Sequence, residues 1–247
     1  MRLFILSDIH GNLEALEAVL RDAEKFADNH SVFVCLGDLV GYGANPEEVA
    51  QTVRKLGALT VLGNHEKGVV DPGSRGNFNP QAWQAVCWAA SQLSGQNKGW
   101  IAELPASLSL EGCRFVHGLP PNDVNSYLFQ ASPQKLRQAM DQISEDVCFV
   151  GHTHMLRLVS LVGDEVTAER LEQGMRILPP GVRFIVNAGA VGQPRDDDLR
   201  AKYCIYDPTT RELTVRFVSY DAKTAARKIL AAEQPRVFAE RLAQVDE

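Results

Sequence analysis

The sequence lacks any apolar run long enough to cross a membrane. A membrane-spanning helix needs roughly 20 consecutive apolar residues, whereas the apolar N-terminal stretch already becomes polar at Ser7. No secretory signal pattern is present at the start of the chain. The sequence therefore predicts a cytoplasmic protein that has no membrane partner.

Cysteine arrangements typical of disulfide-rich or zinc-binding proteins are also missing. The five cysteines are far apart, and none has the spacing of a zinc site: Cys35, Cys87, Cys113, Cys148 and Cys204. Most are flanked by Val, Leu, Phe or Ile, which is typical of small buried hydrophobic residues. We therefore expect free cysteines in the protein interior rather than a disulfide framework.

The chain has fewer positively than negatively charged residues. The chain has 25 Lys and Arg residues against 31 Asp and Glu residues, which gives a formal net charge of −6. Such a balance argues against a broad electrostatic grip on a nucleic-acid backbone, although a local cationic site stays compatible with it. A small phosphorylated substrate fits this composition better than an extended nucleic acid does.

The length and the hydrophobic pattern predict one α/β domain over residues 1–247. The chain is 45% hydrophobic, and no internal repeat, low-complexity segment or linker divides it. In the first part, apolar strands alternate with amphipathic helices, as in parallel α/β sheets. The expected strands cover 3–6, 31–36 and 59–62, and the expected helices cover 12–26 and 46–55.

The segment 68–105 is a candidate helical cap over a site. It begins with a polar stretch, expected as a loop over 68–80, and continues with a helix over 81–93 that carries Trp83 and Trp88. Aromatic residues in a helix usually pack in the core, so we favour a packing role for these tryptophans.

The second part of the chain is rich in strands. One clear helix, over 133–141, interrupts them, and the tail over 222–244 is helical with a break before Pro235. This tail is interpreted as an element that packs on the core or forms a homo-oligomer. Two facing sheets with helices outside them would account for so many strands in one domain. The expected strands are 107–110, 113–117, 147–150, 156–162, 175–178, 182–187, 201–206 and 212–218.

Five short motifs rich in Asp, His and Asn follow the apolar runs. Residues two apart at the end of a strand point the same way, so each histidine-containing pair can present two ligands to one face. Any one of these motifs occurs often by chance, but all five at strand ends indicate a metal site. The motifs are Asp8-Ile9-His10, Gly37-Asp38, Gly63-Asn64-His65-Glu66, His117-Gly118 and Gly151-His152-Thr153-His154.

The donor types restrict the metal. Asp38 offers an oxygen able to bridge two cations, and Asn64 adds a neutral carbonyl oxygen. Imidazole and oxygen ligands without a thiolate suit manganese, iron, zinc, cobalt or nickel. Two such ions about 3.5 to 4 Å apart can hold a bridging hydroxide in line with a phosphorus atom, so no covalent enzyme intermediate is required.

In this order the motifs resemble those of the calcineurin-like metallophosphoesterase superfamily, whose pattern is DxH, GDxxG, GNHE, H and GHxH. The resemblance covers most of the chain and implies a four-layer α/β/β/α sandwich with two facing mixed sheets. It also implies two divalent transition-metal ions, most often manganese, with Asp38 as the bridge. One metal would be held by Asp8, His10, Asp38 and His154, and the second by Asp38, Asn64, His117 and His152.

His65 is the catalytic residue that the resemblance implies. It would contact the phosphate together with Asn64 and would protonate the leaving alkoxide as a general acid. A carboxylate such as Glu66 is a candidate to orient its imidazole. Because His65 and all seven expected ligands are present, the sequence favours an enzyme over a non-catalytic metal-binding scaffold.

The chain looks closest to the small prokaryotic phosphodiesterases and dinucleoside polyphosphate hydrolases of that superfamily. The segments 37–43 and 192–196 are similar to theirs, whereas the protein Ser/Thr phosphatase branch has Asp-Arg where this chain has Gly41-Tyr42. We therefore predict hydrolysis of phosphodiester or phosphoanhydride bonds in cyclic nucleotides or dinucleoside polyphosphates. A phosphomonoesterase or a nuclease on the same metals is the alternative.

Arg195 is a candidate substrate-binding residue after a Gly-Gln-Pro turn. It precedes Asp196, Asp197 and Asp198. The sequence leaves two interpretations open: Arg195 faces a phosphate, or it forms a solvated ion pair with these aspartates.

Overall fold

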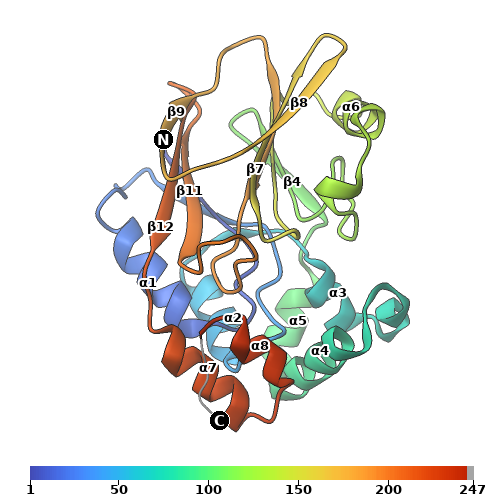
Figure 1. Cartoon of the computed structure of the whole chain (residues 1–247), viewed down its shortest axis with the longest axis vertical. Helices are drawn as coiled ribbons and strands as arrows, with labels where there is room; N and C mark the ends of the chain where they lie inside the picture. The colour runs from blue at the N-terminus through green and yellow to red at the C-terminus, as the bar shows by residue number, and fades with distance from the viewer. Residues whose placement is uncertain (244–247) are drawn as a thin grey trace.

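Two facing mixed sheets form the centre of the molecule, and helices cover their outer faces (Figure 1). The computed structural model describes residues 1–243. Figure 1 shows α6 (Pro133–Asp141) on the opposite side of the two sheets from α1 (Leu13–Ala23). The predicted four-layer α/β/β/α sandwich is therefore confirmed.

The first sheet has the strand order β3-β2-β1-β11-β12-β9. Its strands are β1 (Leu3–Leu6), β2 (Val32–Cys35), β3 (Leu59–Thr60), β9 (Gly174–Ile177), β11 (Ala201–Asp207) and β12 (Glu212–Val218). The strands β1, β2 and β3 are parallel, because helices connect them, and β11 runs antiparallel to β1. The carboxyl ends of the three parallel strands therefore meet at one edge.

The second sheet has the order β4-β5-β6-β10-β7-β8. Its strands are β4 (Ser107–Leu110), β5 (Cys113–Val116), β6 (Val147–Val150), β7 (Leu156–Val162), β8 (Glu165–Arg170) and β10 (Arg183–Ala188). Here β5, β6 and β10 are parallel. Their carboxyl ends carry the loops that begin at His117, Gly151 and Gly189.

Alternation along the strands builds the core on both sides of each sheet. In β1, Leu3 and Ile5 face the second sheet, where they join a cluster that includes Phe149. The intervening Phe4 and Leu6 face the helices of the outer layer. Because successive side chains of a strand point to opposite faces, an apolar strand of this kind is buried on both sides.

The outer helices begin and end at recognisable caps. Asn12 accepts a hydrogen bond from the backbone N–H of Ala15 at 3.1 Å and is the N-cap of α1. Proline occupies the first turn of several helices, where its missing N–H costs nothing. The remaining α-helices are α2 (Pro46–Lys55), α3 (Asn64–Val70), α4 (Pro80–Gln92), α5 (Gly95–Ala102), α7 (Ala222–Ala231) and α8 (Arg236–Glu240).

Several elements differ from the sequence prediction. The prediction of a polar loop over 68–80 is wrong, because α3 continues to Val70 and a 3-10 helix follows over Pro72–Asn77. Helix α5 was not predicted, since its two glycines and few apolar residues give no amphipathic pattern. Strand β8 was not predicted either, because it is an edge strand that is exposed over most of its length and lacks apolar alternation.

The tryptophans and cysteines that were expected to pack in the core differ in their burial. Trp88 packs against the core between α1, α2 and the first sheet, as predicted. Trp83 lies against the ring of Phe78, with 5.6 Å between ring centroids. Four cysteines are buried and free as expected, but Cys87 is exposed because it lies on the outer face of α4.

The tail packs on the rest of the molecule. Helix α7 contacts α1, and α8 contacts α7. Gln244, the predicted end of this tail, lies outside the described residues, and the homo-oligomer stays a prediction. Among residues 1–243, no helix is long and apolar enough to cross a membrane.

Candidate metal centre

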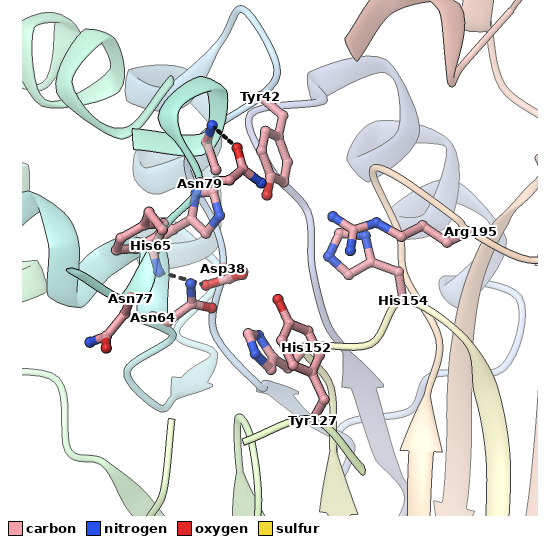
Figure 2. A pocket seen from close by; sticks show the side chains of 12 residues that line it. Asp38, Tyr42, Asn64, His65, Asn77, Asn79, Tyr127, His152, His154 and Arg195 are labelled. Atoms are coloured by element: carbon pink, nitrogen blue, oxygen red, sulfur yellow. Dashed lines mark hydrogen bonds between the residues drawn. The ribbon is translucent and has the colours of Figure 1, made fainter. Parts of the chain in front are cut away.

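The structure brings the seven predicted ligand side chains together at the carboxyl ends of the parallel strands. Asp8, His10, Asp38 and His154 form one group, and Asp38, His117 and His152 form a second, with the donor atoms of each group within 4.8 Å of one another. Asn64 joins the second group, since its Oδ1 lies 3.1 Å from Nε2 of His117. Asp38 belongs to both groups, and Figure 2 shows it between Asn64 and His152.

Most of these residues have a strained backbone. A left-handed conformation costs a residue other than glycine roughly 1–2 kcal/mol, and such strain is concentrated at functional sites. The surrounding hydrogen bonds hold it, for example from the N–H of His10 to the carbonyl of Asp38 at 2.8 Å. The φ angles are 53° at Asp8, 50° at His10, 51° at Asp38, 66° at His152 and 59° at His154.

Gly63 allows the loops to approach one another this closely. A Cβ atom at this position would lie 2.3 Å from both the backbone nitrogen and Oδ1 of Asp38. Any larger residue would displace the Asp38 carboxylate. The glycine before Asn64 is therefore required by the position of Asp38 rather than by the turn alone.

Backbone carbonyls orient all four candidate histidine ligands. The contacts are His10 Nδ1 to Val40 O at 3.0 Å, His117 Nδ1 to Leu36 O at 2.8 Å, His154 Nδ1 to Gln193 O at 2.6 Å and His152 Nε2 to Asn125 O at 3.1 Å. A carbonyl oxygen only accepts hydrogen bonds, so in each ring this nitrogen carries the proton. The other nitrogen is thereby turned toward the centre, as in metal-binding histidines whose second nitrogen is fixed from outside.

The inward nitrogens meet in pairs. Nε2 of His10 lies 3.1 Å from Nε2 of His154, and Nε2 of His117 lies 3.1 Å from Nδ1 of His152. Between His10 and His154, two lone pairs at this distance repel unless a cation lies between or beside them. With the carboxylates of Asp8 and Asp38 next to them, the donor set fits two divalent cations with nitrogen and oxygen ligands.

Burial and neighbouring charges set the protonation of the side chains themselves. Burial lowers the pKa of His10 and of His154 well below the ordinary range of histidine, so a proton does not fill the space between them. At His117, burial acts in the same direction, but Asp38 outweighs it and raises the pKa to about 9. Burial opposes ionisation of Asp38, yet the adjacent His117 and His65 hold its pKa well below the ordinary range. The anionic Asp38 therefore attracts positive charge to the centre.

His65 lies at the wall of the pocket that opens above the metal groups. Its backbone N–H donates to Oδ1 of Asp38 at 2.9 Å, and its ring contacts those of His10 and Tyr42 edge-on at 4.7 and 4.6 Å. Within residues 1–243, its buried Nδ1 has no hydrogen-bond partner. Burial lowers the pKa of His65 to about 4. The ring of His65 is therefore neutral, although the Asp38 carboxylate beside it acts in the opposite direction.

Glu66 does not orient His65, contrary to the suggestion from the sequence. Its carboxylate accepts hydrogen bonds from the backbone N–H groups of Asp38, Val40 and Gly63 at 2.6, 3.1 and 3.1 Å. Since both oxygens are used in this way, Glu66 holds the loop that carries Asp38. Glu66 therefore helps to position Asp38, a candidate metal ligand.

Several pocket residues were not foreseen from their motifs. Beside the candidate ligands and the predicted Arg195, the pocket is lined by Tyr42, Asn77, Asn79 and Tyr127 (Figure 2). The ring of Tyr127 stacks on His152 with 4.0 Å between centroids. Asn77 and Asn79 come from the segment interpreted as a cap, so this segment forms part of the wall.

Arg195 lies beside His154 at the pocket (Figure 2). The three following aspartates pair with other cations: Asp196 with Lys202 at 2.6 Å, Asp197 with Arg170 at 2.9 Å and Asp198 with Arg200 at 2.5 Å. Across residues 1–243, no carboxylate forms an ion pair with Arg195. The guanidinium of Arg195 therefore lines the pocket without a carboxylate ion-pair partner.

Comparison with known proteins assigns this centre to a family. The calcineurin-like phosphoesterase family matches residues 1–156 of the chain. The crystal structure of a metallophosphoesterase from Sphaerobacter thermophilus superimposes with a TM-score of 0.84 at 33% identity, covering 98% of each chain. The chain therefore belongs to the calcineurin-like phosphoesterases, and it is a phosphoesterase.

Two further relatives are similar in sequence. An uncharacterized protein of Methanocaldococcus jannaschii is 36% identical over 243 residues, which are 96% of each chain. A symmetrical bis(5'-nucleosyl)-tetraphosphatase of Psychromonas ingrahamii is 40% identical over 68 residues, which are 27% of this chain and 24% of that protein.

Proposed function

We propose that this phosphoesterase hydrolyses phosphodiester or phosphoanhydride bonds of small molecules, either cyclic nucleotides or dinucleoside polyphosphates, with two divalent transition-metal ions. The observation that carries the proposal is the convergence of four imidazole nitrogens, each turned inward by a backbone carbonyl, on the carboxylates of Asp8 and Asp38. A buried set of this composition has little use other than cation binding.

Asp8, His10, Asp38 and His154 would hold one ion, and Asp38, Asn64, His117 and His152 the other. When bound, the two ions supply a hydroxide nucleophile and neutralise the charge that develops on the phosphoryl oxygens. Manganese is the proposed metal by resemblance, and iron, zinc, cobalt and nickel suit the same donors. Asp38 is the common residue, and the hydrogen bond from the N–H of His65 leaves its second oxygen, Oδ2, facing His10 at 3.5 Å and His117 at 3.3 Å.

His65 would act as the general acid. Its ring lines the pocket, and the phosphate of a bound substrate would raise its pKa from the low value that burial imposes. The imidazolium then donates its proton to the leaving oxygen as the bond to phosphorus breaks. Asn64 and Arg195 would contact the phosphate and the remainder of the substrate.

The walls of the pocket support a small substrate. Polar and aromatic side chains line it, among them Asn77, Asn79 and Tyr127 (Figure 2). The similarity of a 68-residue segment to a symmetrical dinucleoside tetraphosphatase supports phosphoanhydrides as one substrate class. Gly41-Tyr42 in place of Asp-Arg speaks against a protein phosphatase.

A panel of substrates and metals tests the proposal. The protein would be stripped with a chelator and reloaded with manganese, iron, zinc, cobalt or nickel. We expect a higher kcat/KM for bis-p-nitrophenyl phosphate and diadenosine tetraphosphate than for p-nitrophenyl phosphate and a phosphoserine peptide, and no turnover by the stripped protein. A preference for the monoester or the phosphopeptide would overturn the substrate class, and full activity after stripping would overturn the metal centre.

A further inference from the structure

Arg241, just after α8, contacts the segment that carries Arg195, and Arg195 lines the pocket. Nη1 of Arg241 donates to Oε1 of Gln193 at 3.4 Å, two residues before Arg195 in the chain. Its guanidinium also lies 5.8 Å from the ring centre of Phe238, which packs on Tyr42 with 4.7 Å between centroids. Arg195 approaches the same Tyr42 ring, at 6.0 Å. The two arginines therefore flank one aromatic pair.

The packing of α8 fixes this arrangement. Phe238 and Leu242 are buried with Tyr42 in a cluster that also contains residues of α4 and α7. Figure 1 shows α7 and α8 at the same end of the molecule as α3 and α4. Arg241 lies between the buried Phe238 and Leu242 along the chain, so its backbone position is set by this cluster.

Within residues 1–243, no carboxylate forms an ion pair with Arg195 or Arg241. The neighbouring Asp196, Asp197 and Asp198 are all paired with other cations. Partial burial, followed by the charge of Arg195, lowers the pKa of Arg241. Two adjacent cations without an ion-pair partner favour the binding of an anion.

Gln193 connects this cationic edge with the metal centre. Its side chain accepts the hydrogen bond from Arg241, and its carbonyl oxygen orients the ring of His154 at 2.6 Å. An anion held by the arginines would therefore lie beside the candidate metal groups. That position suits the phosphate adjacent to the one that is cleaved.

We propose that Arg195 and Arg241 form a subsite for a phosphate of the substrate other than the one that is hydrolysed. Planar guanidinium groups bind phosphate oxygens in a bidentate manner, and a pair of them suits the charge of a polyphosphate chain. This inference rests on the proposed function and narrows it. Phosphoanhydrides with at least two phosphates, such as dinucleoside polyphosphates, engage the subsite, whereas cyclic nucleotides with one phosphate do not.

Kinetics with two substrates test the subsite. We expect Arg241→Gln to raise KM for diadenosine tetraphosphate about 10-fold with kcat within about twofold, because the contact is the same in ground and transition states. The rise in KM for bis-p-nitrophenyl phosphate, which has one phosphate, should be at least about fivefold smaller. Arg241→Lys keeps the charge but loses the bidentate geometry, so it should restore only part of the affinity. Arg227→Gln, which removes an exposed arginine from α7, should alter neither KM.

Each other result counts against the subsite. An unchanged KM for the tetraphosphate would overturn it, and so would an equal rise for both substrates or a loss of metal in Arg241→Gln, since either would show a structural role. If the wild-type protein cleaves only bis-p-nitrophenyl phosphate, the inhibition constant of diadenosine tetraphosphate replaces KM as the readout. Failure of the wild-type protein to cleave either substrate with any metal would instead refute the proposed function.

Discussion

The two sides of the pocket are built in different ways. On the metal side, the seven candidate ligands are almost completely buried, and backbone carbonyls, strained loops and Glu66 fix their positions. On the substrate side, Asn77, Asn79 and Arg195 are exposed and come from segments far apart in the sequence. This contrast indicates that the candidate metal ligands are held rigidly. The choice of substrate depends on a surface that can vary without displacing these ligands.

The largest effect should follow from a change at the shared carboxylate. In Asp38→Asn, loss of the charge common to both groups should remove metal from both sites and lower kcat by about 10³-fold or more. Elemental analysis and steady-state kinetics measure the two quantities. Asp197→Asn, which removes an exposed carboxylate, is the control. Full loading of Asp38→Asn at both sites with intact activity would refute the role of Asp38 as the bridge.

A smaller loss should follow from removal of the general acid. His65→Ala should lower kcat by about 10²-fold while metal content stays near normal, because His65 is outside the two ligand groups. The loss should be larger for substrates with poor leaving groups, which need protonation most. His30→Ala, at an exposed position outside the motifs, is the matched control. Loss of metal in His65→Ala, or full activity with a poor leaving group, would show that the assigned role is wrong.

On the substrate side, KM should change rather than kcat. Arg195→Ala should raise KM about 10-fold for a polyphosphate substrate and leave kcat nearly unchanged, because the guanidinium contacts the part of the substrate that does not react. The effect should grow with substrate charge. Arg21→Ala, at an exposed position of α1, serves as the control. An unaltered KM for diadenosine tetraphosphate would exclude Arg195 from recognition.

The smallest effect is expected at Tyr127, where the two sides meet. Tyr127→Leu removes the ring that stacks on His152, and we expect a rise in KM of about threefold, in line with the modest energy of one aromatic contact. Tyr127→Phe keeps the ring and should lie closer to the wild type. A fall in metal content of Tyr127→Leu would mean that the ring supports His152 as a ligand instead.

The same contrast explains what the sequence could predict. The two facing sheets and the grouping of Asp8, Asp38 and His152 were foreseeable, since each of these residues lies in the loop just after a strand and parallel strands bring their carboxyl ends together. Glu66 was misjudged because its partners are backbone N–H groups of another loop, which no side-chain pattern reveals.

The substrate side had no comparable signal. Tertiary packing alone places Tyr127 and Arg241: Tyr127 stacks on His152 in the pocket, and the packing of Phe238 on Tyr42 brings Arg241 to Gln193. Neither Tyr127 nor Arg241 belongs to a motif or follows a strand. For the same reason α5 was missed, since it is stabilised by its contacts with α2 and α3 and not by a strong helical pattern of its own.

Anomalous diffraction from crystals of the manganese-loaded protein would test the central claim most directly. The account predicts two anomalous peaks per chain about 3.5 to 4 Å apart, one surrounded by Asp8, His10 and His154 and the other by Asn64, His117 and His152, with Asp38 in contact with both. A single peak, or two peaks that do not share Asp38, would contradict it.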